Sequence, residues 1–367
     1  MQIDFANLKI QHNLYKEEIE EAILKVARDC NFIMGTQIDE LERNLEKFTG
    51  AKYAISCSSG TDALLLAMMA LDIQPDDEII TTPFTFFATA ETIAFLKAKP
   101  VFVDIDEKTY NIDPKKIEEK ISSKTKAIIP VSLYGQPCDM DEINQIAKKY
   151  NLKVIVDGAQ SFGSTYKGIS DSNLGDISCT SFFPAKPLGC YGDGGALFTN
   201  DEKLADKIKS LRLHGQSIRY HHQYIGMGGR LDTIQAAVLN VKLKYYPKDL
   251  KLRQDVAEKY TKVLNAKNIE TPFVKSDRTS AWAQYSIRVQ NRTELQTKLQ
   301  NLGIPTAVHY PMPLHVQECF KYLNLKEGDF PISEKVSKEI MSLPMNPYVT
   351  DEEIEFIVGS LAKELRC

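Results

Sequence analysis

The sequence predicts an α/β fold with a mostly parallel central sheet, helices on both faces, and a smaller α+β domain after it. Between about residues 50 and 240, short apolar runs alternate with amphipathic stretches. Nearly continuous apolar strands separated by helices are typical of parallel sheets buried on both faces. After a long helical stretch near residues 231–264 the pattern changes. A length of 367 residues fits one large domain followed by a smaller one.

Six strands and five helices are expected in the first part of the chain. The predicted strands are residues 53–56, 78–81, 100–104, 127–131, 154–156 and 195–199. The predicted helices are residues 62–71, 88–97, 114–120, 140–150 and 201–211. In such sheets ligands bind beyond the carboxyl ends of the strands. Residues 58–61 and 130–135 and Asp157 all follow strands, so we expect them to converge.

The second part of the chain predicts fewer and more varied elements. Residues 282–289 alternate like a half-buried strand, and residues 295–302 form a helical pattern that stops at Gly303. Residues 308–313 are predicted to be extended, and residues 350–353 form a capping box that opens a last amphipathic helix. We place the boundary at residues 246–249. This gives a large domain, residues 1–247 including the N-terminal segment, and a small domain, residues 248–367.

The overall composition excludes several classes of function. Apolar residues make up 43% and charged residues 26%, as in ordinary soluble globular proteins. A net charge of -4 provides no basic field, so no nucleic-acid partner is expected. The longest apolar stretch, residues 63–71, is too short to cross a membrane, and the first residues do not resemble a secretory signal. Seven cysteines without a CxxC pair indicate reduced thiols and a cytoplasmic protein.

Lys186 and Asp157 are the residues that point most directly to a chemistry. Most lysines are solvated, but Lys186 lies in a turn with two phenylalanines, two prolines and a leucine. Desolvation lowers a lysine's pKa and leaves a free amine that can condense with an aldehyde. Asp157 ends an apolar run with no basic neighbour, and a protonated pyridine nitrogen would supply the cation that a buried carboxylate needs. The pair predicts a site for pyridoxal 5'-phosphate (PLP).

A phosphate seat is predicted just before the helix at residues 62–71. Gly60 and Thr61 precede that helix, where backbone amides and the helix N-terminus favour an anion. A plain serine N-cap is the alternative interpretation of this segment. Ser181, five residues before Lys186, is expected to be a second phosphate donor.

Two further residues are expected around the cofactor ring. Among the three phenylalanines of residues 82–89, we assign Phe86 to the ring face and expect the other two to lie in the core. Gln160 follows Asp157 by three residues and is expected to reach the cofactor's 3-oxygen.

The remaining polar candidates divide into substrate residues and residues without an assigned role. Arg230 suits a carboxylate or a phosphate, although an ion pair with Asp232 explains it equally well. His309 and Tyr310 are candidates to face the substrate.

Other histidines and one cysteine are expected to be structural. The histidine spacings match no zinc motif, so no metal is expected. His221 and His222 are expected at the surface or an interface. Cys190, near Lys186, is a possible nucleophile but fits better as a small buried side chain.

Taken together, these motifs resemble the DegT/StrS-type sugar nucleotide aminotransferases, PLP enzymes of fold type I. The resemblance runs from end to end. It rests on residues 3–9, 58–64, 83–86, 157–161, 181–189, 230–237 and 343–347.

The resemblance implies a role for each site residue. Lys186 would carry the cofactor and later move a proton between cofactor and substrate carbon. Asp157 would hold the pyridine nitrogen, Gln160 the ring oxygen and Phe86 the ring face. The phosphate would be held by Gly60, Thr61 and Ser181. It also implies a homodimer with shared active sites, L-glutamate as amino donor and a nucleotide-linked keto sugar as acceptor.

Residues 181–195 and 219–222 look most similar to enzymes that act on UDP-2-acetamido-3-oxo sugars. Those enzymes make 3-amino sugars for surface polysaccharide, such as lipopolysaccharide O-antigen, or for lipid A. The implied acceptor is a 3-oxo-glucose or 3-oxo-glucuronate type of UDP sugar, and residues 230, 309 and 310 do not decide between them. A 4-keto-6-deoxy sugar aminotransferase is the alternative, and a non-catalytic regulatory or binding protein on this scaffold is a more distant one.

One position departs from the family pattern. Many members have an asparagine two residues before the arginine that matches Arg230, and it contacts the cofactor phosphate across the subunit interface. Gly228 stands there in this chain. A phosphate ligand from the second subunit is therefore not assigned.

Overall fold

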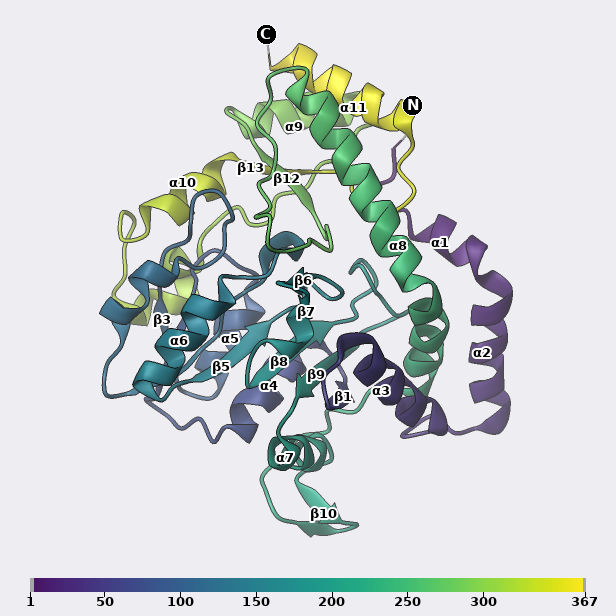
Figure 1. The fold of residues 1–367 in the computed structure, drawn as a ribbon, viewed down its shortest axis with the longest axis vertical. Coiled ribbons are helices and arrows are strands. Elements are labelled where there is room, and N and C mark those ends of the chain that lie inside the picture. The colour runs from purple at the N-terminus through teal and green to yellow at the C-terminus, as the bar shows by residue number, and fades with distance from the viewer. Residues whose placement is uncertain (1–2, 366–367) are drawn as a thin grey trace.

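The computed structural model describes residues 3–365, and its centre is a seven-stranded sheet (Figure 1). The strand order is β1-β9-β8-β5-β4-β2-β3. The strands are β1 (Tyr53–Cys57), β2 (Glu78–Thr81), β3 (Lys99–Phe102), β4 (Thr125–Ile128), β5 (Lys153–Asp157), β8 (Ile177–Ser181) and β9 (Gly195–Thr199). Neighbours from β8 to β3 pair in parallel, whereas β9 runs antiparallel to both β1 and β8. The predicted mostly parallel sheet is confirmed.

Helices cover both faces of this sheet, as the alternating residues of its strands require. On one face, Ile55, Ile79 and Ile155 pack against α4 (Gly60–Ala70) and α7 (Glu202–Arg212). On the other face, Ala54 and Phe198 pack against α3 (Thr36–Thr49) and α8 (Thr233–Asn265). The helix α6 (Met140–Tyr150) covers β2, β4 and β5 on that same side. The remaining helices of this part are α1 (Leu8–Leu14), α2 (Lys16–Asp29) and α5 (Ala88–Phe95).

In the larger part of the molecule, several elements differ from the predicted ones. The first three helices were not predicted. Strand β8 was also missed, because residues 177–181 carry hydroxyls and a thiol in place of Val and Ile. Residues 114–120 form two 3₁₀ turns, Pro114–Lys116 and Glu118–Lys120, in place of the expected helix. The backbone amides there bond the carbonyls three residues back, as Ile117 does with Pro114, and this is the bonding pattern of 3₁₀ turns.

The smaller part of the molecule is α+β. It pairs β12 (Tyr285–Arg288) with β13 (Ile340–Leu343) antiparallel and adds α9 (Arg292–Asn301), α10 (Pro331–Glu339) and α11 (Asp351–Glu364). The predicted capping box at Thr350 is present and opens α11.

The long helix α8 joins the two parts (Figure 1). Its first half packs in the core beside the sheet, and its second half packs with the smaller part. The boundary proposed at residues 247–248 therefore lies inside one continuous helix. Ile3, which we assigned to the large domain, packs with the smaller part, and its amide donates to the Gly303 carbonyl.

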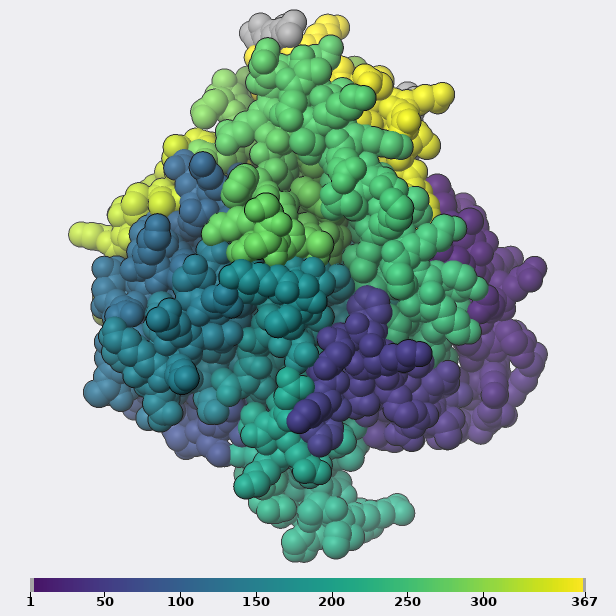
Figure 2. Space-filling model, viewed as in Figure 1, coloured from purple at the N-terminus to yellow at the C-terminus, as the bar shows by residue number. Residues whose placement is uncertain are grey.

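One hairpin stands away from the body of the molecule (Figures 1 and 2). It pairs β10 (Gln216–Ile218) with β11 (His221–His222). Another short pair, β6 (Thr165–Tyr166) with β7 (Ile169–Ser170), lies near the sheet. Within residues 3–365, no helix has the length and apolar character needed to cross a membrane.

Candidate active site

A cavity of about 510 Å³ lies at the carboxyl ends of the parallel strands. Its volume falls in the range usual for small-molecule sites. Nine of the ten residues assigned from the sequence line it: Gly60, Thr61, Phe86, Asp157, Gln160, Ser181, Lys186, His309 and Tyr310. The loops after β1, β2, β5 and β8 converge there, as expected for strands whose carboxyl ends share one edge of the sheet.

Asp157 is a buried carboxylate at the last position of β5. Its Oδ2 accepts from the Thr89 hydroxyl at 2.8 Å, and its Oδ1 accepts from the Ala159 amide at 3.2 Å. Burial raises the pKa of Asp157, while these hydrogen bonds and the charge of Lys186 act against that rise. No ion pair of Asp157 is present among residues 3–365. The site therefore holds an acid that a cationic ligand would stabilise.

Lys186 lies in the loop between β8 and β9, and its amide donates to the Phe183 carbonyl. Burial lowers the pKa of its amine, and the charge of Asp157 only partly offsets that effect. A lysine with this shift supplies a neutral amine near physiological pH more readily than a surface lysine does.

The N-terminus of α4 lies close against the end of β8. A Cβ added to Gly60 would lie 2.6 Å from Ser181 Cβ, so only glycine permits this approach. Ser59 caps the helix by accepting from the Asp62 amide at 3.0 Å. The first amides of a helix have no partner within it, so this corner offers N–H and O–H donors to an anion.

Gln160 is buried with both ends of its amide held. Its Oε1 accepts from the Tyr134 amide at 2.8 Å, and its Nε2 donates to the Tyr310 phenol at 3.1 Å. Burial raises the pKa of Tyr310, as does the charge of Asp157, so its hydroxyl remains protonated.

Phe86 lies on the open side of the cavity, with its ring 6.0 Å from that of Tyr310. It is 55% exposed in the single chain. Phe84 is fully buried and Phe87 packs against Phe320, so the two other phenylalanines belong to the core as expected.

Arg230 is the one assigned residue that does not line the cavity of its own chain. In the part of the chain that the structure describes, its side chain has no hydrogen bond and no ion pair, with Asp232 or with any other residue. The alternative interpretation as an ion pair with Asp232 is therefore wrong for this structure.

Two groups of polar residues outside the cavity lie where the sequence placed them. His221 and His222 are exposed on the projecting hairpin. Cys190 is fully buried, its thiol donates to the Phe182 carbonyl at 3.0 Å, and burial raises the pKa of the thiol to about 11. A thiol whose pKa is raised this far forms very little thiolate at neutral pH, so Cys190 is a buried packing residue and not a nucleophile.

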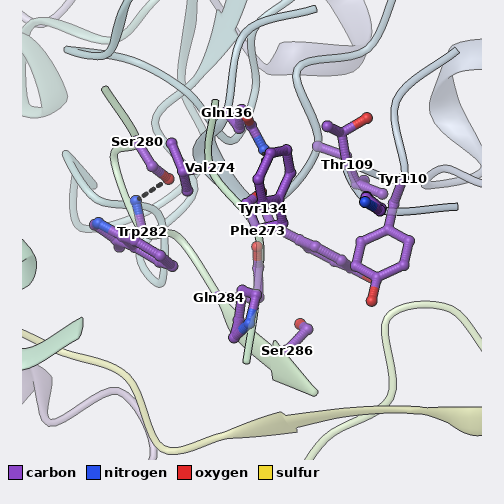
Figure 3. Close-up of a pocket in the computed structure, with 13 residues that line it drawn as sticks. Thr109, Tyr110, Tyr134, Gln136, Phe273, Val274, Ser280, Trp282, Gln284 and Ser286 are labelled. Carbon is purple, nitrogen blue, oxygen red and sulfur yellow. Dashed lines mark hydrogen bonds between the residues drawn. The ribbon is translucent and has the colours of Figure 1, made fainter. Parts of the chain in front are cut away.

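Several cavity residues were missed from the sequence. Thr89, the second residue of α5, does not itself line the cavity but donates to Asp157, and a hydroxyl at the start of a helix after a strand was the available signal. Asp193 and Gln284 also line the cavity. The Oε1 of Gln284 is buried without a hydrogen-bond partner within residues 3–365, and Gln284 lines a second, smaller pocket as well (Figure 3). Nothing local in the sequence marks Gln284, because the cavity forms only when β12 packs against the large part.

The residues present fit PLP. Asp157 provides a buried acid without a cationic partner in the described part of the chain, Lys186 provides an amine with a lowered pKa, and Gly60 opens a corner that a Cβ would fill.

Comparison with known proteins identifies relatives over the whole chain. The model of the DegT/DnrJ/EryC1/StrS aminotransferase family matches residues 13–362. The chain is 50% identical over 359 residues to the UDP-2-acetamido-2-deoxy-3-oxo-D-glucuronate aminotransferase of Pseudomonas aeruginosa, covering 98% of this chain and 99% of that protein. It is 43% identical to the pleiotropic regulatory protein of Geobacillus stearothermophilus, covering 100% and 99%. It is 42% identical to the dTDP-3-amino-3,6-dideoxy-alpha-D-galactopyranose transaminase of Aneurinibacillus thermoaerophilus, covering 98% of each.

Solved structures show the same fold. A DegT DnrJ EryC1 StrS aminotransferase from Brucella abortus is 38% identical, with a TM-score of 0.96 over 99% of this chain and 100% of that one. NtdA from Bacillus subtilis, solved with bound cofactor PMP, is 31% identical, with a TM-score of 0.92 over 100% of this chain and 86% of that one.

Proposed function

Because the chain belongs to the DegT/DnrJ/EryC1/StrS aminotransferase family, we propose that it transfers the amino group of L-glutamate to carbon 3 of a UDP-2-acetamido-2-deoxy-3-oxo-hexose. The protein is an aminotransferase, and its cofactor is pyridoxal phosphate. The observation that carries the choice of sugar is the 50% identity, end to end, with an enzyme named for the 3-oxo-glucuronate sugar. That identity favours the uronate over 3-oxo-glucose.

When bound, PLP carries the amino group from donor to acceptor and withdraws electrons from the substrate carbon. Asp157 would keep the pyridine nitrogen protonated, and this cation would satisfy the buried carboxylate. Gly60, Thr61 and Ser181 would hold the phosphate, Phe86 would cover the ring face, and Gln160 would contact the ring oxygen. These contacts would orient the group in the cavity that Lys186 also lines.

Lys186 is proposed to take the proton from the donor carbon and to return a proton to the acceptor carbon. Its lowered pKa supports this, since a neutral amine can accept a proton and the resulting ammonium can release it. Arg230, His309 and Tyr310 are proposed to bind substrate, with Arg230 reaching the active site of the partner in a homodimer.

The homodimer is supported by what the single chain leaves open. The projecting hairpin exposes Ile218 (73%) and Tyr220 (79%), and Phe86 on the cavity wall is half exposed. Large apolar groups gathered on a projecting element favour a protein partner. The cysteines of residues 3–365 are free thiols, which supports the proposed cytoplasmic location. The product, a UDP 3-amino sugar, would serve synthesis of surface polysaccharide such as O-antigen, or of lipid A.

In the first step of the test, glutamate converts the cofactor of the purified protein to its amine form. The loss of PLP absorbance measures this conversion. UDP sugars with a 3-oxo or a 4-oxo group are then added, each with and without a carboxylate at carbon 6. We expect the 3-oxo-glucuronate sugar to restore the PLP spectrum fastest, and Lys186→Ala to restore nothing. Restoration by the 4-oxo sugar alone contradicts the proposal, and a protein without a PLP spectrum supports a regulatory role.

A further inference from the structure

Asp171 is a second buried carboxylate near the cavity, and the proposed function does not use it. It is 1% exposed, begins the short 3₁₀ turn Asp171–Asn173 before β8, and does not line the cavity. Within residues 3–365 it forms no ion pair. A buried charge without a cation is costly unless hydrogen bonds satisfy it. The hydrogen-bond partners of Asp171 therefore indicate its role.

The two oxygens of this carboxylate bond hydroxyls on two different loops. Oδ1 accepts from the Ser132 hydroxyl at 3.0 Å, and Oδ2 accepts from the Ser161 hydroxyl. Both serines are fully buried. Ser132 lies in the loop after β4, and Ser161 lies in the loop after β5. An ionised carboxylate carries no hydrogen, so both serines donate to it and it ties the two loops together.

The same two loops hold Gln160 at the cavity wall. Gln160 directly precedes Ser161, and its Oε1 accepts from the amide of Tyr134, two residues after Ser132. The Ser132 amide also donates to the Asp157 carbonyl at 3.0 Å. A shift of one loop against the other would therefore turn the Gln160 amide in the cavity.

Gly158 gives the carboxylate room to lie against the loop after β5. A Cβ added to Gly158 would lie 3.2 Å from Asp171 Oδ2 and 3.2 Å from Ser161 Oγ. These distances are tighter than ordinary van der Waals contact. A side chain at residue 158 would therefore press on the tie itself, at a point between Asp157 and Gln160.

We infer that Asp171 is a positioning residue for the cofactor: its carboxylate ties the loop after β4 to the loop after β5 and so fixes the Gln160 amide in the cavity. The inference rests on the proposed function in naming the cofactor's ring oxygen as the contact of Gln160. Asp171 does not itself touch the cofactor. Because the tie uses two accepting oxygens, an amide at this position does not replace it in full.

Three ionisable groups surround the carboxylate of Asp171. Burial is the largest effect and raises the pKa of Asp171 to about 6. Its two serine hydrogen bonds and the charge of Arg278 act against this rise, whereas the charge of Asp157 adds to it. Burial also raises the pKa of the Cys138 thiol, so that neighbour stays neutral. Asp171 is therefore mostly ionised at pH 8, and the tie is best tested there.

The first test compares Asp171→Asn with the native protein at pH 8. The amide oxygen accepts from one serine, and the amide NH2 leaves the hydrogen of the other serine without an acceptor. We expect the Kd for PLP, titrated into the cofactor-free protein, to rise about tenfold. The circular dichroism band of bound PLP should also change, because it reports how the protein holds the ring. The cofactor-free variant should unfold at no lower temperature, since a buried charge has been removed.

Two outcomes of this comparison overturn the inference. One is native PLP affinity with a native circular dichroism band. The other is a lower unfolding temperature with a native band, which is the result of a merely structural role. Ser161→Ala provides a second variant that keeps the charge, and it should weaken PLP binding in the same way. In Asp171→Asn it should weaken binding by less than about twofold more, because both changes break one tie; fully additive losses also overturn the inference.

Asp249→Asn is the matched control. Asp249 is likewise 1% exposed, lies outside the cavity, and forms no ion pair in the described part of the chain. It accepts from the side-chain amide of Gln11 at 2.8 Å and from the phenol of Tyr348 at 3.3 Å. The control should keep the native PLP affinity and band, and an equal loss in it contradicts a specific role of Asp171. No glutamate or sugar is used, so a failure of the proposed reaction leaves these results interpretable.

Discussion

At the scale of single residues, burial pushes Asp157 and Lys186 in the same direction, toward their neutral forms. Each would be costly as an isolated buried charge, and no ion pair within residues 3–365 relieves either one. Sites where desolvation shifts an acid and a base in this way are often functional. The same two residues were predicted from the sequence, because a lysine in an apolar turn and an acid at a strand end are each unusual.

The charge of Asp157 is testable by Asp157→Asn. The amide oxygen still accepts from the Ala159 amide, and the amide NH2 can donate to the Thr89 hydroxyl, so the fold should persist, but the side chain cannot hold the pyridine nitrogen protonated. We expect kcat to fall by about 10²- to 10⁴-fold, the range of a lost proton-holding group. Circular dichroism checks the fold, and single-turnover spectra with glutamate measure the rate. Thr89→Val, which removes one hydrogen bond and keeps the charge, should lose far less; equal losses in both variants would show that the carboxylate charge is not required.

Lys242 is a second buried lysine, 3% exposed, and it supports the Lys186 loop from behind. Its ammonium donates to the Gly189 carbonyl at 2.5 Å and lies 5.2 Å from the centre of the Tyr191 ring. Burial lowers its pKa to about 8. Between that value and its ordinary pKa near 10.5, the unfolded chain binds a proton that the folded chain does not. Stability contributed by this group therefore rises as pH increases from 8 to 10.

The measurement compares urea unfolding of the native protein and Lys242→Met across this pH window. The native free energy of unfolding should rise by roughly 2 kcal/mol more than that of the variant between pH 8 and 10. Parallel pH curves for the two proteins would contradict the assignment. Lys251→Met, at an exposed position of the same helix, serves as control and should follow the native curve.

At the scale of elements, the site is built from the ends of strands, and this is why much of it was predictable. The chain order of strands and helices implies a parallel sheet, and parallel strands bring their carboxyl ends to one edge. Asp157 and Ser181 end β5 and β8, and Gly60 follows β1. Local patterns therefore sufficed to bring these residues together, even though β8 itself was not predicted.

The strand pairing and contacts of the smaller part could not be predicted from local sequence patterns in the same way. Ser286 pairs with Ser342 across 56 residues of sequence, and neither carries a local signal. Strand β13 was not predicted, so the partner of β12 and the contact of Ser342 with His309 had no basis in the sequence. Contacts of this kind depend on which strands pair, and pairing is a property of the folded chain and not of a window of residues.

The close approach of α4 to β8 is testable by Gly60→Ala. The added Cβ would lie 2.6 Å from Ser181 Cβ and 3.2 Å from its Cα, so the helix N-terminus must move away. We expect the Kd for PLP, measured by fluorescence quenching, to rise about tenfold or more, since one lost donor costs on the order of 1.4 kcal/mol. Gly359→Ala is the control, because Gly359 is exposed in α11 with nothing near its Cβ position. That variant should bind PLP normally and unfold at slightly higher temperature.

At the scale of the whole molecule, one chain presents an open cavity and, apart from it, Arg230, whose side chain has no ion pair or hydrogen bond within residues 3–365. Arg230 does not line the cavity of its own chain. Gly228, two residues before it, lies so close to the His214 ring that an added Cβ would be 3.1 Å from a ring atom. The hairpin that follows His214 projects with exposed apolar side chains (Figure 2). A twofold dimer places the same surface of each chain against its partner, so a residue outside one cavity can complete the other.

Mixed dimers test whether Arg230 acts across that interface. Lys186→Ala and Arg230→Ala should each be almost inactive as homodimers. If Arg230 serves the partner's cavity, a mixed dimer places both lesions in one site and leaves the other site intact. Equimolar subunits, unfolded and refolded together, should then regain about a quarter of native activity, since half of the dimers are mixed and each has one working site. If Arg230 serves its own cavity, every site in the mixture carries a lesion, and mixing restores nothing.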